Sequence, residues 1–260
     1  MGNRRIAIIG AGRLGSALAL GFSKNSAVVV SDPDKGKLKA LELRNSRISA
    51  ARSNQEAISG CGIVVLALKP DMVCAGVRAL LPEISEKLVV SCAAMVSIGE
   101  IEKCGAMKVM RVMPNVCAEV GEGFFACAPG KGLTEDETKM LIGLFSDLGI
   151  CERMEERDVE AITGVSGSGP AFFAYFAKSV FRSALKAGLP EKEARVAVAQ
   201  TMLGTAELLL AGRDFDEIIS RVTSPGGTTE QGLKMLEQGN VSGRIEEAVS
   251  GAIKKAREKI

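Results

Sequence analysis

Short apolar, β-branched runs alternate with helical patterns through the first part of the chain, up to about Glu156. Several of these runs are apolar at nearly every position, which is typical of strands covered on both faces. Apolar residues at helical spacing separate the runs, and this alternation predicts a parallel sheet with right-handed crossovers. The predicted strands are Arg5–Ile9, Ala27–Ser31, Ile63–Leu68, Leu88–Ser91, Lys108–Val112 and Ile150–Met154, and the predicted helices are Leu14–Ser23, Lys35–Leu43, Asp71–Leu81 and 134–148.

Strand patterns stop after Glu156, and only helical patterns follow. A bundle of these helices is thin by itself, so we expect its apolar faces to pack against a second copy of the chain. An ordinary helical cap on the first domain is the alternative. The predicted helices are Pro170–Ala187, Glu191–Ala211, Asp214–Val222, Glu230–Gln238 and Val241–Lys259.

Composition narrows the classes of function. The 260 residues carry 33 Lys and Arg against 31 Asp and Glu, a net charge of +2, which argues against a protein that coats nucleic acid or an anionic membrane. The chain has no histidine, so any mechanism must work without imidazole, and we expect no metal site.

The cysteines and the N-terminus indicate where the protein works. None of the seven cysteines forms a C-x-x-C pair, and most lie in apolar stretches, as small core residues in a reducing compartment do. The apolar run after Arg5 is too short for a signal peptide, and no apolar stretch approaches the ~20 residues that span a bilayer. We therefore expect a cytoplasmic protein.

The first predicted strand runs into Gly10-Ala11-Gly12-Arg13-Leu14-Gly15, a G-x-G-x-x-G pattern that opens a helix. In this setting Gly10 allows a tight turn, Gly12 lets a pyrophosphate approach the backbone, and Gly15 lets the helix pack closely on the strand. The free N–H groups of a helix N-terminus favour the bound anion. The pattern predicts an α/β protein with an N-terminal Rossmann-type parallel-sheet domain (1–156), followed by an all-α C-terminal dimerisation domain (157–260). The cofactor would be NADPH or NADH.

Three further segments follow predicted strands at the edge where such sheets bind ligands. Asp32 ends the second strand, where an acidic residue commonly binds the ribose hydroxyls and disfavours a 2′-phosphate. Lys35 and Lys37 follow it and could hold that phosphate instead, so the choice between NADH and NADPH stays open. Lys69 could approach the cofactor, and the small side chains of residues 91–94 leave room for a nicotinamide ring.

Several segments are more informative together than any one of them alone. They are Gly10–Gly15, Leu66–Pro70, Val90–Ile98, Arg111–Asn115, Thr163–Phe172 and Val222–Leu233. The first is common to many dinucleotide enzymes, whereas the last three are specific in their order and spacing. With these segments the chain resembles the pyrroline-5-carboxylate reductase family nearly from end to end.

This resemblance implies a Rossmann domain, a helical domain that interlocks with a partner subunit, and hence a homodimer or a dimer-based homo-oligomer. It also implies the reaction, which is reduction of the ring C=N of 1-pyrroline-5-carboxylate to L-proline by NAD(P)H, the final step of proline biosynthesis. The implied cofactor contacts are Gly10, Ala11, Gly12, Arg13, Leu14, Asp32, Asn54, Lys69, Pro70, Ala93 and Ala94. The implied substrate contacts are Ser224, Gly226, Gly227, Thr228 and Thr229.

The segment 224–229 suits an anion on physical grounds as well. Two glycines precede a predicted helix start, with Thr228 and Thr229 as capping candidates, and consecutive backbone N–H groups there suit a carboxylate. A plain helix–helix connection capped by threonine is the alternative. We hypothesise that the substrate carboxylate docks on the amides of residues 226–228, and that the Thr229 hydroxyl is the catalytic partner of the ring nitrogen.

Two positions depart from the family pattern. Many members carry Ser, or Asn followed by Arg, at the end of the second strand and prefer NADPH, so Asp32 puts that preference in doubt. Lys178 stands where an acidic residue is frequent.

Two other functions remain open. The first is a reductase of other imines or of β-hydroxy acids. A β-hydroxy-acid reductase would use a catalytic lysine of the helical domain, and Lys178 and Lys186 are available for that role. That reading leaves the segment 224–229 unexplained. A non-catalytic dinucleotide-binding sensor is the other alternative, and an intact carboxylate loop argues against it.

Overall fold

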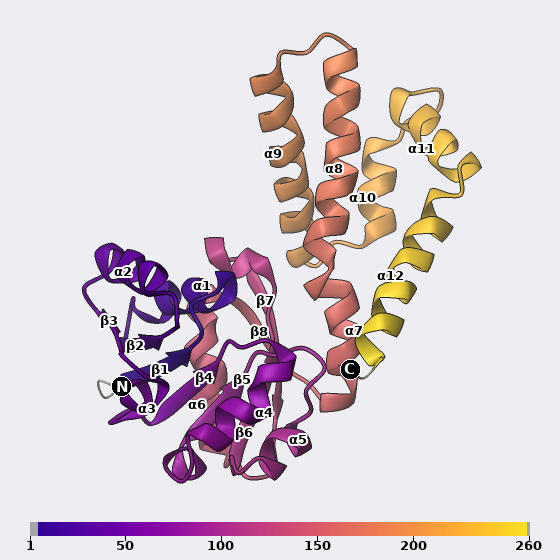
Figure 1. Cartoon of the computed structure of the whole chain (residues 1–260). Helices are drawn as coiled ribbons and strands as arrows, with labels where there is room; N and C mark the ends of the chain where they lie inside the picture. Colours follow the sequence, from indigo (N-terminus) through magenta and orange to yellow (C-terminus); the bar gives the residue numbers. More distant parts are fainter. Residues whose placement is uncertain (1–4, 259–260) are drawn as a thin grey trace. The chain divides into compact units, whose positions relative to one another are not determined.

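The computed structural model describes residues 5–258 and contains an eight-stranded sheet (Figure 1). The strand order is β3-β2-β1-β4-β5-β6-β7-β8, and neighbouring strands are parallel except for the antiparallel pair β6–β7. The strands are β1 (Arg5–Ile9), β2 (Ala27–Ser31), β3 (Ile48–Ala50), β4 (Ile63–Leu66), β5 (Leu88–Ser91), β6 (Lys108–Met113), β7 (Gly123–Pro129) and β8 (Gly149–Arg153).

All six predicted strands are present, and the predicted parallel arrangement is confirmed for β1 to β6, whereas β7 and β8 are parallel to each other and run in the opposite direction. The sequence analysis missed β3 and β7. The three residues of β3 are too few for a periodic pattern. Strand β7 follows β6 after a single short 3-10 turn, η2 (Val116–Val120), instead of a crossover helix, so the chain returns antiparallel.

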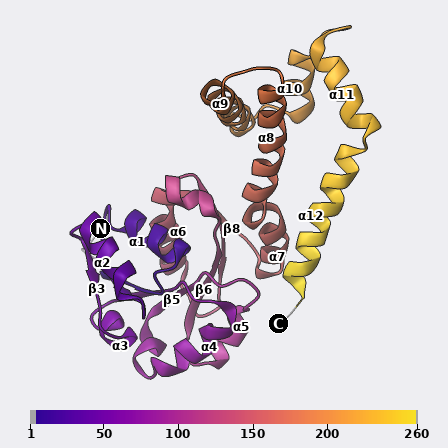
Figure 2. The same cartoon turned by 45° about the horizontal axis from the view of Figure 1, so that its top comes forward.

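Helices cover both faces of the sheet (Figure 2). One face packs against α1 (Arg13–Phe22), α2 (Lys35–Arg44) and α6 (Glu135–Phe145) in a core that includes Leu18, Leu41 and Phe145. The other face packs against α3 (Asn54–Ile58), α4 (Pro70–Ala79) and α5 (Ile98–Lys103) in a core that includes Ile58, Val77 and Ile101. Burial on both faces explains why the strands of the parallel part are almost wholly apolar.

The start of α6 is closed by a capping box. The Thr134 hydroxyl accepts from the Glu137 amide at 3.2 Å, and the Glu137 carboxylate accepts from the Thr134 amide at 2.9 Å. Lys108 donates to the same carboxylate at 2.7 Å. The lysine hydrogen bond and the cap hold the pKa of Glu137 below its ordinary value.

The chain forms two compact units. The first contains the sheet, continues through the short helix α7 (Val159–Ile162) and the π-helical turn η5 (Thr163–Gly167) to Ser168, and includes residues 252–258. The second unit runs from Gly169 to Gly251. Its helices are α8 (Gly169–Lys186), α9 (Glu191–Leu210), α10 (Phe215–Val222), α11 (Thr228–Gln238) and α12 (Val241–Arg257), the last of which ends in the first unit. The boundary at residues 156 and 157 stays a sequence prediction.

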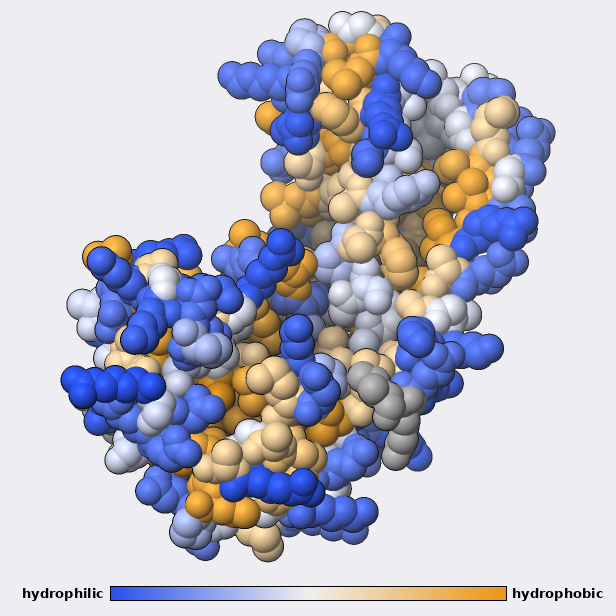
Figure 3. Space-filling view, in the orientation of Figure 1, coloured by the Kyte–Doolittle hydropathy of each residue, from blue (hydrophilic) through white to orange (hydrophobic). Residues whose placement is uncertain are grey.

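The helices of the second unit leave large apolar side chains exposed. On α8 and α9 the buried residues are Gly169 and Ala194, whereas Phe173 is 66% exposed and Tyr175 is 77% exposed. Figure 3 shows apolar side chains at the surface along the helices of this unit. Within residues 5–258, none of the helices combines the length and the apolar character that crossing a membrane requires.

Candidate cofactor and substrate sites

Four parallel strands end at the same edge of the sheet and bring the predicted cofactor residues together. These strands are adjacent in the sheet in the order β2-β1-β4-β5. The chain adds strands on one side of β1 up to β3 and then crosses to the other side at β4, so the strand order reverses between β1 and β4. Gly10 follows β1, Asp32 follows β2, Lys69 lies three residues after β4, and Ala93 lies just beyond β5. Ligands of open α/β sheets bind at this kind of switch point, outside the carboxyl ends of the strands.

Gly10 and Gly15 have the steric roles expected from the sequence, and the role of Gly12 stays a prediction. Gly10 has φ +104°, and a Cβ there would lie 2.5 Å from the Ala67 carbonyl oxygen. A Cβ on Gly15 would lie 2.0 Å from the Gly10 carbonyl oxygen, so only glycine allows this close packing. A Cβ on Gly12 would meet no atom within 4 Å, so the room beside this exposed residue is open to a ligand.

The N-terminus of α1 is free to bind an anion. Its N-cap is Gly12, no side chain caps it, and its first turn holds no acidic residue. The first backbone N–H groups, including those of Arg13 and Leu14, therefore lack a partner inside the helix. Together with the helix dipole they form a site that fits the pyrophosphate of a dinucleotide.

Asp32 is fixed by the backbone on both sides. Its Oδ2 accepts from the Ala11 amide at 2.6 Å, and its Oδ1 accepts from the Asp34 amide at 2.8 Å. The carboxylate thus lies beside the glycine loop at the end of β2, the position at which an acidic residue binds adenosine ribose.

The other predicted cofactor residues also begin helices or turns at this edge. Asn54 is the first residue of α3, after the N-cap Ser53, and exposed Lys69 is the N-cap of α4 with Pro70 at the first helical position. Ala93 is buried and Ala94 half-buried in the turn that leaves β5. Burial raises the pKa of the neighbouring Cys92 thiol to about 12, so this thiol is uncharged at neutral pH.

The predicted substrate loop belongs to the second unit and leads into α11. Gly226 has φ +72°, and Gly227 is the N-cap without a side-chain cap. The Gly226 amide donates to Glu230 Oε2 at 2.9 Å, and the Gly227 amide donates to the Ser224 carbonyl at 2.9 Å. Two of the three amides that the sequence hypothesis assigned to the substrate are therefore engaged within the chain.

The remaining donors of this loop are the first residues of α11. The amides of Thr228 and Thr229 open the helix and have no partner inside it. Within the described part of the chain, the Thr229 hydroxyl makes no hydrogen bond. Lys178 and Lys186, the candidates for a β-hydroxy-acid mechanism, lie on α8, where Lys178 is exposed.

The sequence analysis missed a buried ion-pair cluster at the middle of β6. Arg111 is 2% exposed, and its Nη1 lies 2.9 Å from a carboxylate oxygen of Glu160 and 3.6 Å from one of Glu156. A charged residue with apolar neighbours on both sides in the middle of a strand was the available signal. It indicates a buried charge that needs a partner, although the pattern does not say which one.

Asn115, two residues beyond β6, joins two of the motifs that carry the resemblance. Its side-chain amide donates to Ser166 Oγ at 3.0 Å, and its Oδ1 accepts from the amides of Cys117 and Phe124 at 3.2 and 3.3 Å. The residues 111–115 and the π-helical turn η5 are thereby tied together in the first unit. Across residues 5–258, no group of three or more cysteine or acidic side chains is arranged to hold a metal ion.

Known proteins resemble the chain over its whole length. Residues 156–259 match the family model described as pyrroline-5-carboxylate reductase dimerisation, and residues 5–95 match the model described as NADP oxidoreductase, coenzyme F420-dependent. Pyrroline-5-carboxylate reductase 3 of Macaca fascicularis is 37% identical over 98% of this chain and 96% of that protein. The pyrroline-5-carboxylate reductase of Methanosarcina acetivorans is 36% identical over 99% and 98%.

A solved structure agrees with the sequence relatives. The crystal structure of Plasmodium falciparum pyrroline carboxylate reductase with NADP bound superimposes with a TM-score of 0.88, at 29% identity over 99% of this chain and 98% of that one. The similarity thus spans the glycine loop, the sheet and the helical unit alike. On this combination of sequence identity, coverage and fold, the chain belongs to the pyrroline-5-carboxylate reductase family.

Proposed function

We propose that this chain is an oxidoreductase that reduces 1-pyrroline-5-carboxylate to L-proline, with NADPH or NADH as the hydride donor. This is the final step of proline biosynthesis. The observation that carries the proposal is full-length identity of 36–37% to pyrroline-5-carboxylate reductases. An uncapped helix start in each unit, at α1 and at α11, supplies the anion sites that the reaction needs.

The first unit binds the cofactor, which supplies the hydride when bound. The amides of Arg13 and Leu14 hold the pyrophosphate beside Gly12, and Asp32 receives the adenosine ribose. Lys69 and Pro70 border the same edge with Asn54, and the small side chains of Ala93 and Ala94 face the nicotinamide.

The second unit binds the substrate through the loop Ser224–Thr229. The amides of Thr228 and Thr229 receive the carboxylate, and the loop conformation is maintained by the bonds of Gly226 and Gly227. The Thr229 hydroxyl faces the ring nitrogen. A protonated imine is already a good electrophile, so orientation is the main contribution, and a chain without histidine can provide it.

The active enzyme is a homo-oligomer assembled through the C-terminal helices. Phe173 and Tyr175 on α8 are exposed in the single chain, and packing against the same helices of a second copy buries them. The partners are therefore a small-molecule substrate and further copies of the chain, with no nucleic acid or membrane. Seven unpaired cysteines fit a reducing compartment, and we place the enzyme in the cytoplasm.

The test is an absorbance assay that follows NADPH and NADH with 1-pyrroline-5-carboxylate, with the product identified as L-proline by chromatography. We expect consumption of the cofactor to depend on the substrate and to yield one proline per hydride. A β-hydroxy acid assayed with NAD⁺ or NADP⁺ serves as the negative substrate. Absence of consumption with both cofactors would reject the proposal, and a sensor would bind cofactor without turnover.

A further inference from the structure

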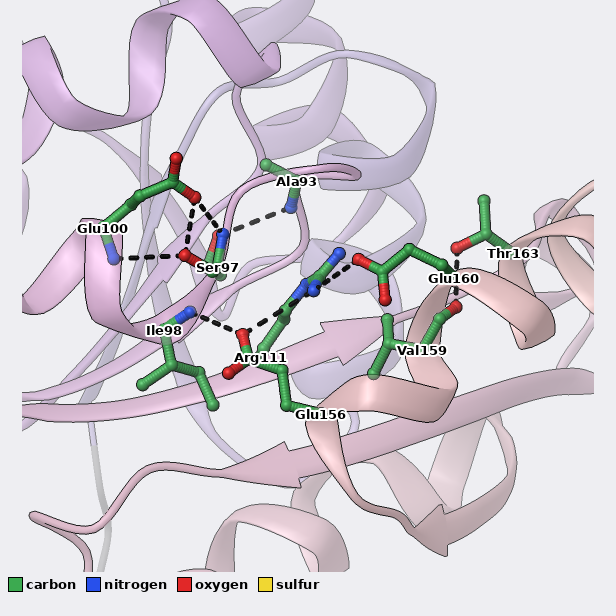
Figure 4. Close-up of polar contacts among 10 residues, drawn as sticks. Ala93, Ser97, Ile98, Glu100, Arg111, Glu156, Val159, Glu160 and Thr163 are labelled. Atoms are coloured by element: carbon green, nitrogen blue, oxygen red, sulfur yellow. Dashed lines mark hydrogen bonds and ion pairs between the residues drawn. The ribbon is translucent and has the colours of Figure 1, made fainter. Parts of the chain in front are cut away.

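Arg111 is the largest fully buried side chain in the described part of the protein. Its Nη1 interacts with both Glu160 and Glu156, while its Nε and Nη2 are buried without a hydrogen-bond partner among residues 5–258. In Figure 4 its guanidinium lies between the turn that carries Ala93 and Ser97 and the helical segment that carries Glu160 and Thr163. A buried ion pair contributes little net stability compared with well-packed apolar side chains, so stability alone does not account for this one.

The cluster adjoins both ends of the turn that faces the proposed nicotinamide site. At one end, the backbone of Arg111 pairs in the sheet with Ser91, whose hydroxyl accepts from the Ala93 amide at 3.4 Å. At the other end, Glu156 Oε1 accepts from the amide of Ile98, the first residue of α5, at 2.6 Å. Between these anchors Met95 has φ +61°, a left-handed conformation that a non-glycine residue keeps only when its surroundings impose it.

The same strand continues this contact with the segment that follows Glu160. Arg111 and Met113 share one face of β6, because alternate residues of a strand lie on the same side, and Asn115 follows two residues beyond the strand. Arg111 binds Glu160, Asn115 binds Ser166, and a Cβ on Gly167 would lie 2.9 Å from Met113 Cε. The turn η5 is a π-helix, an uncommon conformation that is frequent at functional sites.

We propose that Arg111 is a positioning residue for hydride transfer, which acts through Glu156 and Glu160. It fixes the turn Ala93–Ser97 against the segment Val159–Gly167, and so sets the wall on which the nicotinamide rests. The inference rests on the proposed function and deepens it. Misplacement by a fraction of an ångström at such a wall slows the chemical step more than it weakens binding.

The main test is Glu160→Gln, which removes one carboxylate charge and keeps the size of the side chain. We expect kcat to fall about 10-fold or more, with the Kd of NAD(P)H within about 3-fold of wild type. The deuterium isotope effect on kcat, measured with cofactor deuterated at C4, rises because hydride transfer becomes more rate-limiting. Arg111→Lys, which keeps the charge but loses the planar fork, changes kcat in the same direction.

The matched control is Glu135→Gln, which breaks an exposed ion pair with Arg153 in the same unit. Nη1 of Arg153 lies 2.9 Å from Oε1 and 2.8 Å from Oε2 of Glu135, and both side chains are about half exposed. This control is expected to keep the wild-type kcat and isotope effect. Hydrogen–deuterium exchange of the unliganded protein gives a readout independent of activity, and Glu160→Gln, unlike Glu135→Gln, is expected to speed exchange in residues 92–97 and 159–167.

Unchanged kcat, isotope effect and exchange in a folded Glu160→Gln protein would overturn the assignment. Loss of cofactor affinity in proportion to kcat would overturn it too, because the cluster would then serve binding or stability alone. If Arg111→Lys does not fold, Glu160→Gln still decides the matter. A wild-type protein that consumes no NAD(P)H would reject the proposed function, whereas the exchange data would still test the positioning of the turn.

Discussion

The carboxylate of Asp32 accepts a hydrogen bond of 2.6 Å from the backbone amide of Ala11. This contact joins the end of β2 to the glycine loop that follows β1. Strands β1 and β2 pair with each other in the sheet. Because the second oxygen of Asp32 binds the Asp34 amide, the carboxylate is fixed in place by the protein itself. The carboxylate therefore has a fixed position beside the site proposed for the adenosine ribose.

Replacement of Asp32 by serine is expected to shift the cofactor preference toward NADPH. Loss of the carboxylate removes its repulsion of the 2′-phosphate, so the ratio of kcat/KM for NADPH over NADH should rise about 10-fold or more. Steady-state kinetics with both cofactors measures this ratio. Asp34→Ser is the control, since Asp34 is exposed in the same turn and caps α2. An equal shift in both variants would show that Asp32 has no special role.

Gly12→Ala is expected to weaken cofactor binding without unfolding the protein. The new methyl group meets no protein atom within 4 Å, but it occupies the space through which a pyrophosphate approaches the backbone. The Kd of NAD(P)H, measured by fluorescence titration, should rise about 10-fold or more while the Tm stays near wild type. Gly15→Ala should lower the Tm instead, because its Cβ would lie 2.0 Å from the Gly10 carbonyl oxygen. Similar behaviour of the two variants would contradict the division of roles.

Thr229→Ala is expected to lower kcat by about 100-fold, the lower end of what general acid–base groups contribute. The affinity for NAD(P)H should not change, since the residue belongs to the substrate loop. Thr223→Ala is a suitable control, because the Thr223 hydroxyl is engaged with the Ile219 carbonyl at 2.7 Å. Turnover that is unchanged in Thr229→Ala would remove this hydroxyl from the mechanism.

Glu230→Gln is expected to lower the KM for 1-pyrroline-5-carboxylate. The Glu230 carboxylate binds the Gly226 amide at 2.9 Å and so places a negative charge beside the amides proposed for the substrate carboxylate. Relief of about 1 kcal/mol of like-charge repulsion corresponds to a KM about fivefold lower. The KM for NAD(P)H should stay constant in the same assay. The glutamine oxygen can still accept from the Gly226 amide, so a higher KM would instead mean that the loop conformation depends on the charge of Glu230.

Glu137→Gln is expected to destabilise the protein by about 1 kcal/mol at neutral pH through loss of the charged partner in the α6 capping box. The pKa of Glu137 is held below its ordinary value of 4.5 by Lys108 and Thr134, so its contribution is present above that pH and is lost as the pH falls through the folded-state pKa. Urea unfolding should therefore distinguish the variant from wild type at pH 7 and not in strongly acidic buffer. A difference that persists in acid would contradict the role of the charge.

The cofactor edge of the sheet was predictable because its determinants are local. The glycine loop, the acidic end of β2 and the small residues after β5 each follow an apolar strand, and parallel strands place their carboxyl ends at one edge. Strand β3 was too short to show a period. Strand β7 was missed because no crossover helix precedes it, and its direction depends on pairing with β6.

The sequence by itself determined most of the elements, the glycine-rich starts of α1 and α11, and the family to which the motifs point, because each motif depends on neighbours a few positions apart. Only the tertiary structure decided that Arg111 meets Glu156 and Glu160, that Asn115 meets Ser166, and that Glu230 occupies the Gly226 amide. The first two contacts join side chains far apart in the chain, and no periodicity encodes such partners. The third contact joins residues four positions apart, in a loop whose left-handed conformation at Gly226 the sequence pattern does not specify.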